Sequence, residues 1–258
     1  MVNASWAERS AWLRAAQVRF PYVRPAKFAL SNAATRFLGW PMIPEYRLLA
    51  RLGPIGLSLD VGANWGQSLQ AMKRTILAKK FVCFEPARYL ASRLKRRFDN
   101  DPSVQIEAVA LGAADGRFEL FTPHYRNYVF DGLASLDPDK ARNWLSPRRL
   151  RGFDPRNLTL HSETVPVRKL DDYGLSPEIV KIDAQGGELD VVRGGIGTFE
   201  RMRPACLIER PGEELVRLLG SLGLEAYHFD GTALHRDRWA KVPDVLFLNE
   251  DHVRKIGL

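Results

Sequence analysis

Apolar runs and amphipathic runs alternate along the chain from residue 57 to its end. Short apolar runs typical of buried strands lie at 57–61, 81–85, 104–112, 178–183, 205–209, 225–229 and 244–249. Runs with apolar residues at helical spacing lie at 66–77, 87–98, 187–202 and 212–223. This alternation predicts an α/β fold with a mainly parallel sheet and helices on both faces. The connection at 230–243 shows no helical face, so we expect the last two strands to be antiparallel.

Residues 1–50 do not follow this alternation, because aromatic and aliphatic residues are interleaved there with arginines. The pattern predicts short amphipathic helices broken at Pro21, Pro25 and Pro41. We interpret the segment as an N-terminal helical extension of a main domain formed by residues 51–258. Its alternative roles are a lid on the substrate, a dimer contact and an anchor at a membrane surface.

Residues 123–160 are polar, basic and rich in proline, and they show little periodicity. A loop of this length inside a domain is uncommon and usually functional. Residues 140–156 hold six Lys and Arg against one Asp, so we expect this loop to face an anionic substrate, such as a phosphorylated or carboxylated glycan. A solvated basic face without a partner is the alternative.

Charge and cysteine usage set limits on the partners and the compartment. The net charge is +8, from 38 basic and 30 acidic residues. Cys83 and Cys206 lie in apolar strand-like runs, which suits buried thiols in a reducing compartment. No apolar run is long enough for a transmembrane helix, and the N-terminus is charged where a signal peptide is apolar. We therefore expect a cytoplasmic protein, with contact to a membrane surface through residues 1–50 left open.

The stretch "DVGANWG" joins the first strand of the alternation to a helix. Gly62 and Gly66 allow a tight turn and close approach of a ligand to the backbone. Their G-x-x-x-G spacing differs from the dinucleotide pattern G-x-G-x-x-G. Asp60 just before them would repel a pyrophosphate but would hold an ammonium group, which favours S-adenosylmethionine (SAM) over NAD. A turn with only a structural role is the alternative.

Glu85 ends the second strand, 23 residues after Gly62. An acidic residue at about this distance from a glycine turn accepts hydrogen bonds from the ribose hydroxyls of a bound nucleotide. SAM carries the same ribose diol. The alternative for Glu85 is capping of the helix that follows Pro86.

The stretch "EIVKIDAQGGELDVVRGG" contains a second group of acidic residues. Asp183 follows a strand that we place beside the first one, at the sheet edge where α/β proteins bind ligands. Glu188 opens a helix, where a carboxylate also stabilises the helix dipole.

Taken together, these segments resemble the FkbM family of SAM-dependent methyltransferases. The matching segments are "DVGANWGQS", "CFEP", "AVALG", "GLASL", "VRKLDDY", "KIDAQGGELDVVRGG" and "PACLIE", in the order of the family. The resemblance covers roughly residues 57–210. It implies a Rossmann-like class I methyltransferase fold, with a mainly parallel seven-stranded sheet and an antiparallel strand near its edge. It also implies O-methylation, frequently of a sugar hydroxyl on a glycan, glycolipid or secondary metabolite.

The resemblance also implies roles for individual residues. The methionyl end of SAM would be held by Asp60, Gly62, Ala63, Asn64 and Gly66. Glu85 and Pro86 would lie at its ribose, with Asp183 and Glu188 near the transferred methyl group.

A hydroxyl is a weak nucleophile, so a general base would assist the transfer of the methyl group to it. Asp183 is our first choice for the base, with His161 and His124 as second choices because they lie in or beside the long loop. Positioning of the hydroxyl alone is the third alternative. The histidines show no close metal-ligand spacing, and no metal site is predicted.

Two other functions remain open from the sequence. The basic segments allow a methyltransferase acting on RNA or protein. A non-catalytic scaffold that uses the same fold at a membrane is the other alternative. We expect no DNA partner, and the sequence leaves a homo-oligomer open.

Overall fold

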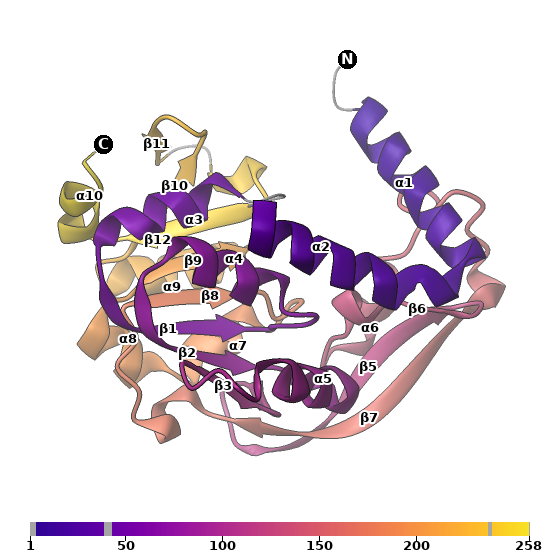
Figure 1. Ribbon diagram of the computed structural model, residues 1–258, viewed down its shortest axis with the longest axis horizontal. Helices are drawn as coiled ribbons and strands as arrows, with labels where there is room; N and C mark the ends of the chain where they lie inside the picture. The colour runs from indigo at the N-terminus through magenta and orange to yellow at the C-terminus, as the bar shows by residue number, and fades with distance from the viewer. Residues whose placement is uncertain (1–3, 39–42, 237–238, 258) are drawn as a thin grey trace.

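The structure is a computed structural model, and it describes residues 4–38, 43–236 and 239–257. Its larger sheet has eight strands in the order β11-β10-β12-β9-β8-β1-β2-β3 (Figure 1). These strands are β1 (Ile55–Val61), β2 (Ala78–Phe84), β3 (Val104–Glu107), β8 (Ile179–Ile182), β9 (Ala205–Glu209), β10 (Glu225–Phe229), β11 (Leu234–His235) and β12 (Asp244–Leu248). Strands β3, β2, β1, β8 and β9 are parallel, and β12 lies antiparallel between β9 and β10.

This topology confirms the mainly parallel sheet and the antiparallel final pair, β10 and β12. The expected seven strands are present, and the two-residue strand β11 adds an eighth at the edge beside β10. Strand β11 comes from the connection at 230–243, where the sequence shows no helical face. A turn closed by Asp230 brings the chain back along β10 and makes this short pairing possible.

Helices cover both faces of this sheet. The helices that follow its strands are α4 (Gln67–Thr75), α5 (Arg88–Phe98), α7 (Glu188–Arg193), α8 (Ile196–Met202), α9 (Glu213–Ser221) and α10 (Glu250–Ile256). Successive residues of β2 point to opposite faces, so Phe81 packs with α4 and α5, and Val82 packs with α7 to α9. Two apolar cores result, one on each side of the sheet.

The helix predicted at 187–202 is wrong as a single element, because α7 and α8 are separated at Gly194 and Gly195. Both glycines lie against neighbouring segments. A Cβ atom at Gly194 would lie 1.9 Å from the carbonyl oxygen of Gly112, and one at Gly195 would lie 2.9 Å from Leu170. These segments can approach so closely only because the two residues between α7 and α8 have no side chains.

The expectation of a long loop at 123–160 is also wrong, because much of this segment belongs to a second sheet or to short helices. The second sheet has the order β4-β7-β5-β6, with β4 (Ala110–Leu111), β5 (Gly116–Tyr125), β6 (Tyr128–Val129) and β7 (Leu158–Arg168). Its main pair, β5 and β7, is antiparallel from Gly116↔Val167 to Tyr125↔Leu158. Most of its residues are partly exposed, which explains why the polar sequence concealed these strands.

Short helices lie between and beside these strands. They are α6 (Pro138–Asn143) and the 3-10 turns η3 (Asp131–Leu133), η4 (Pro155–Asn157), η5 (Leu170–Tyr173) and η6 (Trp239–Lys241). Asp137 caps α6 through the backbone N–H groups of Asp139 and Lys140.

The N-terminal residues form helices α1 (Ala4–Arg19), α2 (Arg24–Leu38) and α3 (Pro44–Leu49), with 3-10 turns η1 (Pro21–Val23) and η2 (Ala50–Leu52). Pro21 opens the turn between α1 and α2, and Pro25 lies in the first turn of α2. Pro41 lies outside the described residues. Helix α2 packs along α4, and α1 extends toward the second sheet (Figure 1).

Basic residues of the 140–156 segment hold α1 in place. The Arg151 guanidinium lies 3.6 Å from the ring centre of Trp12 in α1, and the Arg14 guanidinium of α1 lies 5.0 Å from that of Trp144. Arg14 of α1 donates a hydrogen bond to the carbonyl oxygen of Arg149. Some of the basic residues counted in the 140–156 segment therefore contact α1.

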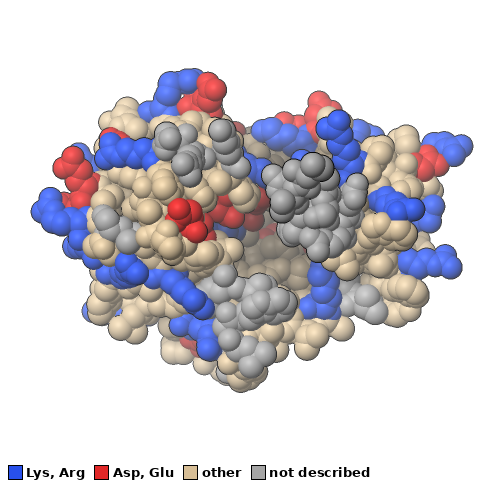
Figure 2. All heavy atoms as spheres, turned by 90° about the horizontal axis from the view of Figure 1, so that it is seen from above, with Lys and Arg blue, Asp and Glu red and all other residues tan. Residues whose placement is uncertain are grey.

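Seen from above, the molecule is hollowed near its middle, with acidic side chains beside the hollow and basic side chains around much of the outline (Figure 2). Trp12, Leu13, Leu30 and Phe37 of the N-terminal helices are exposed. Within the described residues, none of the helices has the length and apolar character needed to cross a membrane. The roles of lid, dimer contact or membrane anchor stay predictions.

The packing of Gly194 predicts a large effect from one added methyl group. We expect Gly194→Ala to destabilise the protein by about 1–3 kcal/mol, because its Cβ would meet the backbone of Gly112. Gly220→Ala is the matched control, since Gly220 lies in α9 with open space around it, and it should be neutral or slightly stabilising. Urea unfolding measures both, and equal effects would contradict the packing argument.

Candidate functional site

A cavity of about 390 Å³ lies where β1, β2 and β8 end. The turns after these strands form one wall, with residues 109–114 beside them. Phe118, Leu120 and Val167 of the second sheet form an apolar wall. Residues 131–140, here called the covering segment, complete the lining. The size is within the range of small-molecule sites, and the position is the ligand edge of an open α/β sheet.

The turn after β1 has the conformation that its glycines predict. Gly62, Asn64 and Gly66 all have positive φ, at 81°, 49° and 80°. A Cβ atom at Gly62 would lie 1.9 Å from the carbonyl oxygen of Asp183, so β1 and β8 could not end this close together with any other residue. Gly62 and Asn64 line the cavity, whereas Ala63 and Gly66 lie behind them and shape the turn.

Glu85 reaches the cavity from the end of β2, next to Pro86, which also lines it. Its carboxylate accepts hydrogen bonds from the backbone N–H groups of Asn64 (2.7 Å) and Ala87 (2.9 Å). Burial raises the pKa of Glu85 to about 7 despite these bonds. A carboxylate has four lone-pair positions, so Glu85 can hold the turn and α5 and still accept a hydroxyl. Both interpretations of Glu85 are therefore compatible.

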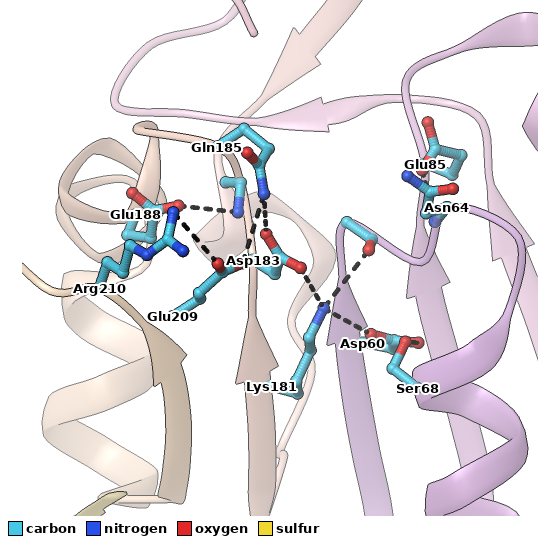
Figure 3. Close-up of polar contacts among 12 residues, drawn as sticks. Asp60, Asn64, Ser68, Glu85, Lys181, Asp183, Gln185, Glu188, Glu209 and Arg210 are labelled. Atoms are coloured by element: carbon cyan, nitrogen blue, oxygen red, sulfur yellow. Dashed lines mark hydrogen bonds and ion pairs between the residues drawn. The ribbon is translucent and has the colours of Figure 1, made fainter. Parts of the chain in front are cut away.

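Asp60 does not face the cavity, although we expected it to hold an ammonium group of the ligand. It is completely buried, accepts a hydrogen bond from the Ser68 hydroxyl (2.6 Å) and lies 3.6 Å from the Lys181 ammonium group (Figure 3). The cation that Asp60 binds in this structure is Lys181, which comes from the neighbouring strand β8.

Lys181 connects the buried acidic residues, and sequence reasoning missed it. Its ammonium group lies 3.6 Å from Asp60 and 3.4 Å from Asp183, and it donates to the carbonyl oxygen of Gly62. Burial opposes its charge, but Asp183 and Asp60 outweigh burial and raise the pKa of Lys181. The available signal was a lysine inside the otherwise apolar run "EIVKI".

Asp183 lines the cavity and is surrounded by polar groups. Gln185 donates a hydrogen bond to it at 2.6 Å (Figure 3). Glu209 at the end of β9 hydrogen-bonds to it as well. Burial acts to raise the pKa of Asp183, but Lys181 and these hydrogen bonds outweigh burial and lower it. Asp183 is therefore ionised at neutral pH.

Glu209 is the second residue that sequence reasoning missed. Burial, with the hydrogen bond and the charge of Asp183, raises the pKa of Glu209 to about 8. Asp244 of β12 lies opposite Glu209 in the sheet and adds to this effect, while Arg210 lies 3.7 Å from Glu209 and opposes it. The Gln185 amide also donates to Glu209, at 3.3 Å, so one side chain connects the carboxyl groups of Asp183 and Glu209.

Glu188 lies outside the lining of the cavity, so the structure gives no support to a catalytic role. Its carboxylate accepts hydrogen bonds from the backbone N–H groups of Ala184 (2.9 Å) and Gly186 (3.0 Å). As the first residue of α7, it fixes the turn that carries Asp183 and Gln185.

His161 and His124 also lie outside this cavity. They stack on each other across β5 and β7, with ring centres 3.9 Å apart, and they line a different cavity. Neither ring belongs to the lining that contains Asp183. The structure therefore gives no support to either histidine as the general base.

The covering segment is hydrogen-bonded to the turns after β1 and β8. The Ser135 hydroxyl donates to the carbonyl oxygen of Gln185 (2.9 Å), and the Lys140 ammonium donates to that of Gly186 (2.7 Å). At its other end, Asp131 accepts a hydrogen bond from the Trp65 indole (2.6 Å). Asp131, Ser135 and Lys140 thus belong to the site, although the sequence suggested only a loop near the substrate.

Comparison with known proteins agrees with this arrangement. Residues 60–229 match the family model described as "Methyltransferase FkbM domain". The 2-O-methyltransferase NoeI of Sinorhizobium fredii is 26% identical over 155 residues, covering 58% of this chain and 61% of that protein. Methyltransferase 1 of Beauveria bassiana is 29% identical over 146 residues, covering 53% of this chain and 57% of that protein. The chain thus spans less than two thirds of these relatives.

Among solved structures, methyltransferase FkbM from Methylobacillus flagellatus has a TM-score of 0.45 and 17% identity. The match covers 75% of this chain and 43% of the Methylobacillus flagellatus chain.

The position of Lys181 predicts a strong dependence of stability on its charge. We expect Lys181→Met to cost about 3–5 kcal/mol in the free energy of unfolding, because it leaves Asp60 and Asp183 without their buried cation. Lys169→Met is the matched control, since Lys169 forms an exposed pair with Asp172 at 3.8 Å and should cost less than about 1 kcal/mol. Urea unfolding of both variants at pH 7 provides the comparison. Similar small losses in the two variants would contradict the role given to Lys181.

Proposed function

The chain belongs to the FkbM methyltransferase family, and we propose that it transfers the methyl group of SAM to a hydroxyl of a sugar-type acceptor. It is a SAM-dependent methyltransferase by this membership. The oxygen acceptor is supported by the name of the Sinorhizobium fredii relative, a 2-O-methyltransferase. The observation that carries the proposal is the Asp183 carboxyl group, which lines the cavity at the carboxyl end of β8 and lies 3.4 Å from the Lys181 ammonium group.

The residues of the cavity fit SAM. Gly62 leaves the floor of the cavity without a side chain, and Asn64 and Glu85 bring polar groups to it. Glu85 suits the ribose diol, and the apolar wall of Phe118, Leu120 and Val167 suits an aromatic base. When bound, SAM supplies a methyl group on a positively charged sulfur. Among the described residues of the lining, carboxyl groups outnumber the one lysine, Lys140, which favours a cationic group over a phosphate and agrees with SAM and not with NAD.

In the proposed reaction, the hydroxyl oxygen of the acceptor forms a bond to the methyl carbon while the carbon–sulfur bond breaks. The sulfur leaves as a neutral thioether and needs no proton. The acceptor must be held in line with the breaking bond, and this positioning accounts for much of the acceleration. Asp183 accepts the hydrogen bond of the hydroxyl and thereby orients its oxygen.

Asp183 can also receive the proton, even though its pKa is lowered. An alcohol oxygen becomes strongly acidic as it gains the methyl group, so a weakly basic carboxylate suffices late in the reaction. Glu209 and Gln185 hold the Asp183 carboxylate in one orientation, and Lys181 keeps it ionised before the transfer. Asp183 is therefore in the form that can accept a proton at neutral pH.

The same charges argue against an RNA acceptor at this place. Asp131, Asp137 and Asp183 line the cavity, and carboxylates there repel phosphate groups.

The base role of Asp183 is tested with Asp183→Asn, which keeps the shape and removes the proton acceptor. We expect the turnover rate to fall by about 10²–10⁴-fold with nearly unchanged affinity for SAM. Asp190→Asn is the matched control, because Asp190 lines the same cavity but its carboxylate pairs with Arg193. The assay uses labelled SAM with a panel of monosaccharides and oligosaccharides, and mass spectrometry locates the methyl group.

Near-normal turnover of Asp183→Asn at saturating SAM and acceptor would show that positioning alone suffices. Loss of SAM affinity without a fall in the saturated rate would assign Asp183 to cofactor binding. Absence of methyl transfer to every sugar of the panel by the unaltered protein would reject the sugar-type acceptor.

A further inference from the structure

Large apolar side chains gather on the outside of the N-terminal helices α1 and α2 (Figure 1). Nine such residues are exposed among those that the structure describes, and six of them lie within residues 12–37. The six are Trp12, Leu13, Phe20, Tyr22, Leu30 and Phe37, with exposed fractions from 48% to 74%. Single exposed apolar residues are ordinary on a protein surface, but a gathering of them marks a surface that contacts a partner.

Helix α2 has its polar side turned inward. Asn32 and Thr35 are almost completely buried, at 2% and 3% exposure. Leu30 and Phe37 are 74% and 70% exposed, and Ala26 lies on the same exposed side of the helix. A helix at the surface of a globular protein normally has the opposite arrangement, with its apolar side toward the core. The outward side of α2 therefore suits an apolar environment.

Contacts with Trp65 fix α2 in this orientation. The Asn32 side-chain amide donates a hydrogen bond to the carbonyl oxygen of Trp65 at 2.9 Å, and Phe28 stacks on the Trp65 ring with centres 4.7 Å apart. Trp65 belongs to the turn after β1, and its indole donates to Asp131, which lines the cavity at the strand ends. The apolar side of α2 cannot turn inward without losing these contacts.

Helix α1 also has apolar residues on its outer side. Trp12 and Leu13 are exposed, and Phe20 follows at helical spacing from Trp12. The rings of Phe20 and Tyr22 are in contact, with centres 6.1 Å apart, so the apolar surface of α1 continues into the turn before α2. The Arg151 guanidinium beside Trp12 suits the boundary between lipid and water, where indole rings lie among headgroups and cations meet phosphate.

Charge decides which partner fits this surface. Residues 4–38 hold six Lys and Arg and one Glu. Arg19 and Lys27 are exposed on the two helices, although Asp131 also attracts Lys27. A bilayer with anionic lipids offers phosphate groups to these cations and an apolar layer to the exposed leucines and rings.

Two other partners fit less well. A second copy of the chain would bring the same excess of positive charge to the contact, which opposes the pairing of two such surfaces. Nucleic acid would neutralise the cations but would leave the exposed leucines in water.

We propose that the surface formed by these six apolar residues, here called the N-terminal face, docks on a bilayer that contains anionic phospholipids. Leu13 and Leu30 enter the apolar layer, and the basic residues of the two helices lie at the headgroups. Because α2 is fixed to Trp65, docking holds the cavity at the strand ends near the bilayer. This inference is independent of the acceptor that is methylated.

Co-sedimentation with unilamellar vesicles tests the docking. The full chain is mixed with vesicles of phosphatidylcholine alone and with vesicles that also contain phosphatidylglycerol. We expect binding to be at least about tenfold tighter to the vesicles with phosphatidylglycerol at low ionic strength, and the difference to shrink in high salt. Equal binding to both kinds of vesicle, or binding to neither, would overturn the proposal.

The variant Leu13→Gln/Leu30→Gln tests the contribution of the apolar side chains. We expect its binding to the phosphatidylglycerol vesicles to weaken by at least about tenfold, because two apolar side chains no longer enter the bilayer. Leu77→Gln is the matched control, since Leu77 is 69% exposed outside the N-terminal helices, and it should bind like the unaltered protein. Unchanged binding of the double variant would also overturn the proposal.

A conservative variant separates insertion into the bilayer from damage to the fold. Leu13→Met/Leu30→Met keeps apolar side chains and should keep the binding, and loss of binding in this variant as well would contradict the proposal. Urea unfolding should give the same stability for all variants, because the replaced side chains are exposed. A dimer that dissociates in Leu13→Gln/Leu30→Gln, seen by light scattering without any binding to vesicles, would assign the N-terminal face to a second copy.

Discussion

One buried ammonium group, that of Lys181, determines how the acidic residues at the centre of the sheet are used. It lies between Asp60 of β1 and Asp183, which follows β8, and it also reaches the carbonyl oxygen of Gly62. Burying charges is costly, and only mutual neutralisation makes this group of residues tolerable. Asp60 is thereby committed to the structure, and Asp183 is kept ionised where it meets the cavity. The chemistry that we assign to Asp183 depends on this arrangement.

Much of the fold could be predicted from the sequence, because its main signals are local. Alternating apolar and amphipathic runs indicated the parallel sheet, and the glycines of "DVGANWG" indicated the turn at its ligand edge. Glu85 and Asp183 were found because each directly follows a strand. The second sheet was missed because its long strands are partly exposed and carry no clear apolar alternation.

The site was less predictable, because it depends on which side chains meet across strands. Lys181 and Asp60 are opposite each other only through the register of β1 and β8. Glu209 approaches Asp183 only because β8 and β9 are neighbours. For two further predicted site residues, the direction of the side chain also decided whether they reach the cavity. Glu188 faces the backbone of its own turn, and His161 faces His124.

The parts outside the α/β core give the protein its individual features. The core supplies the turns after β1, β2 and β8 to the cavity, and Asp183 with them. The second sheet and the covering segment enclose the rest of that cavity. We therefore expect the acceptor to be selected by segments where the chain departs from the alternating pattern of its core.

The ionisation of Asp183 and Glu209 is the central claim, and carboxyl-carbon NMR measures it most directly. Spectra recorded from pH 3 to pH 9, assigned with Asp183→Asn and Glu209→Gln, give the pKa of each group. The account predicts that Asp183 is ionised below its usual range and that Glu209 titrates near pH 8. Ionisation of Glu209 near pH 4, or a pKa of Asp183 above its ordinary value, would contradict it.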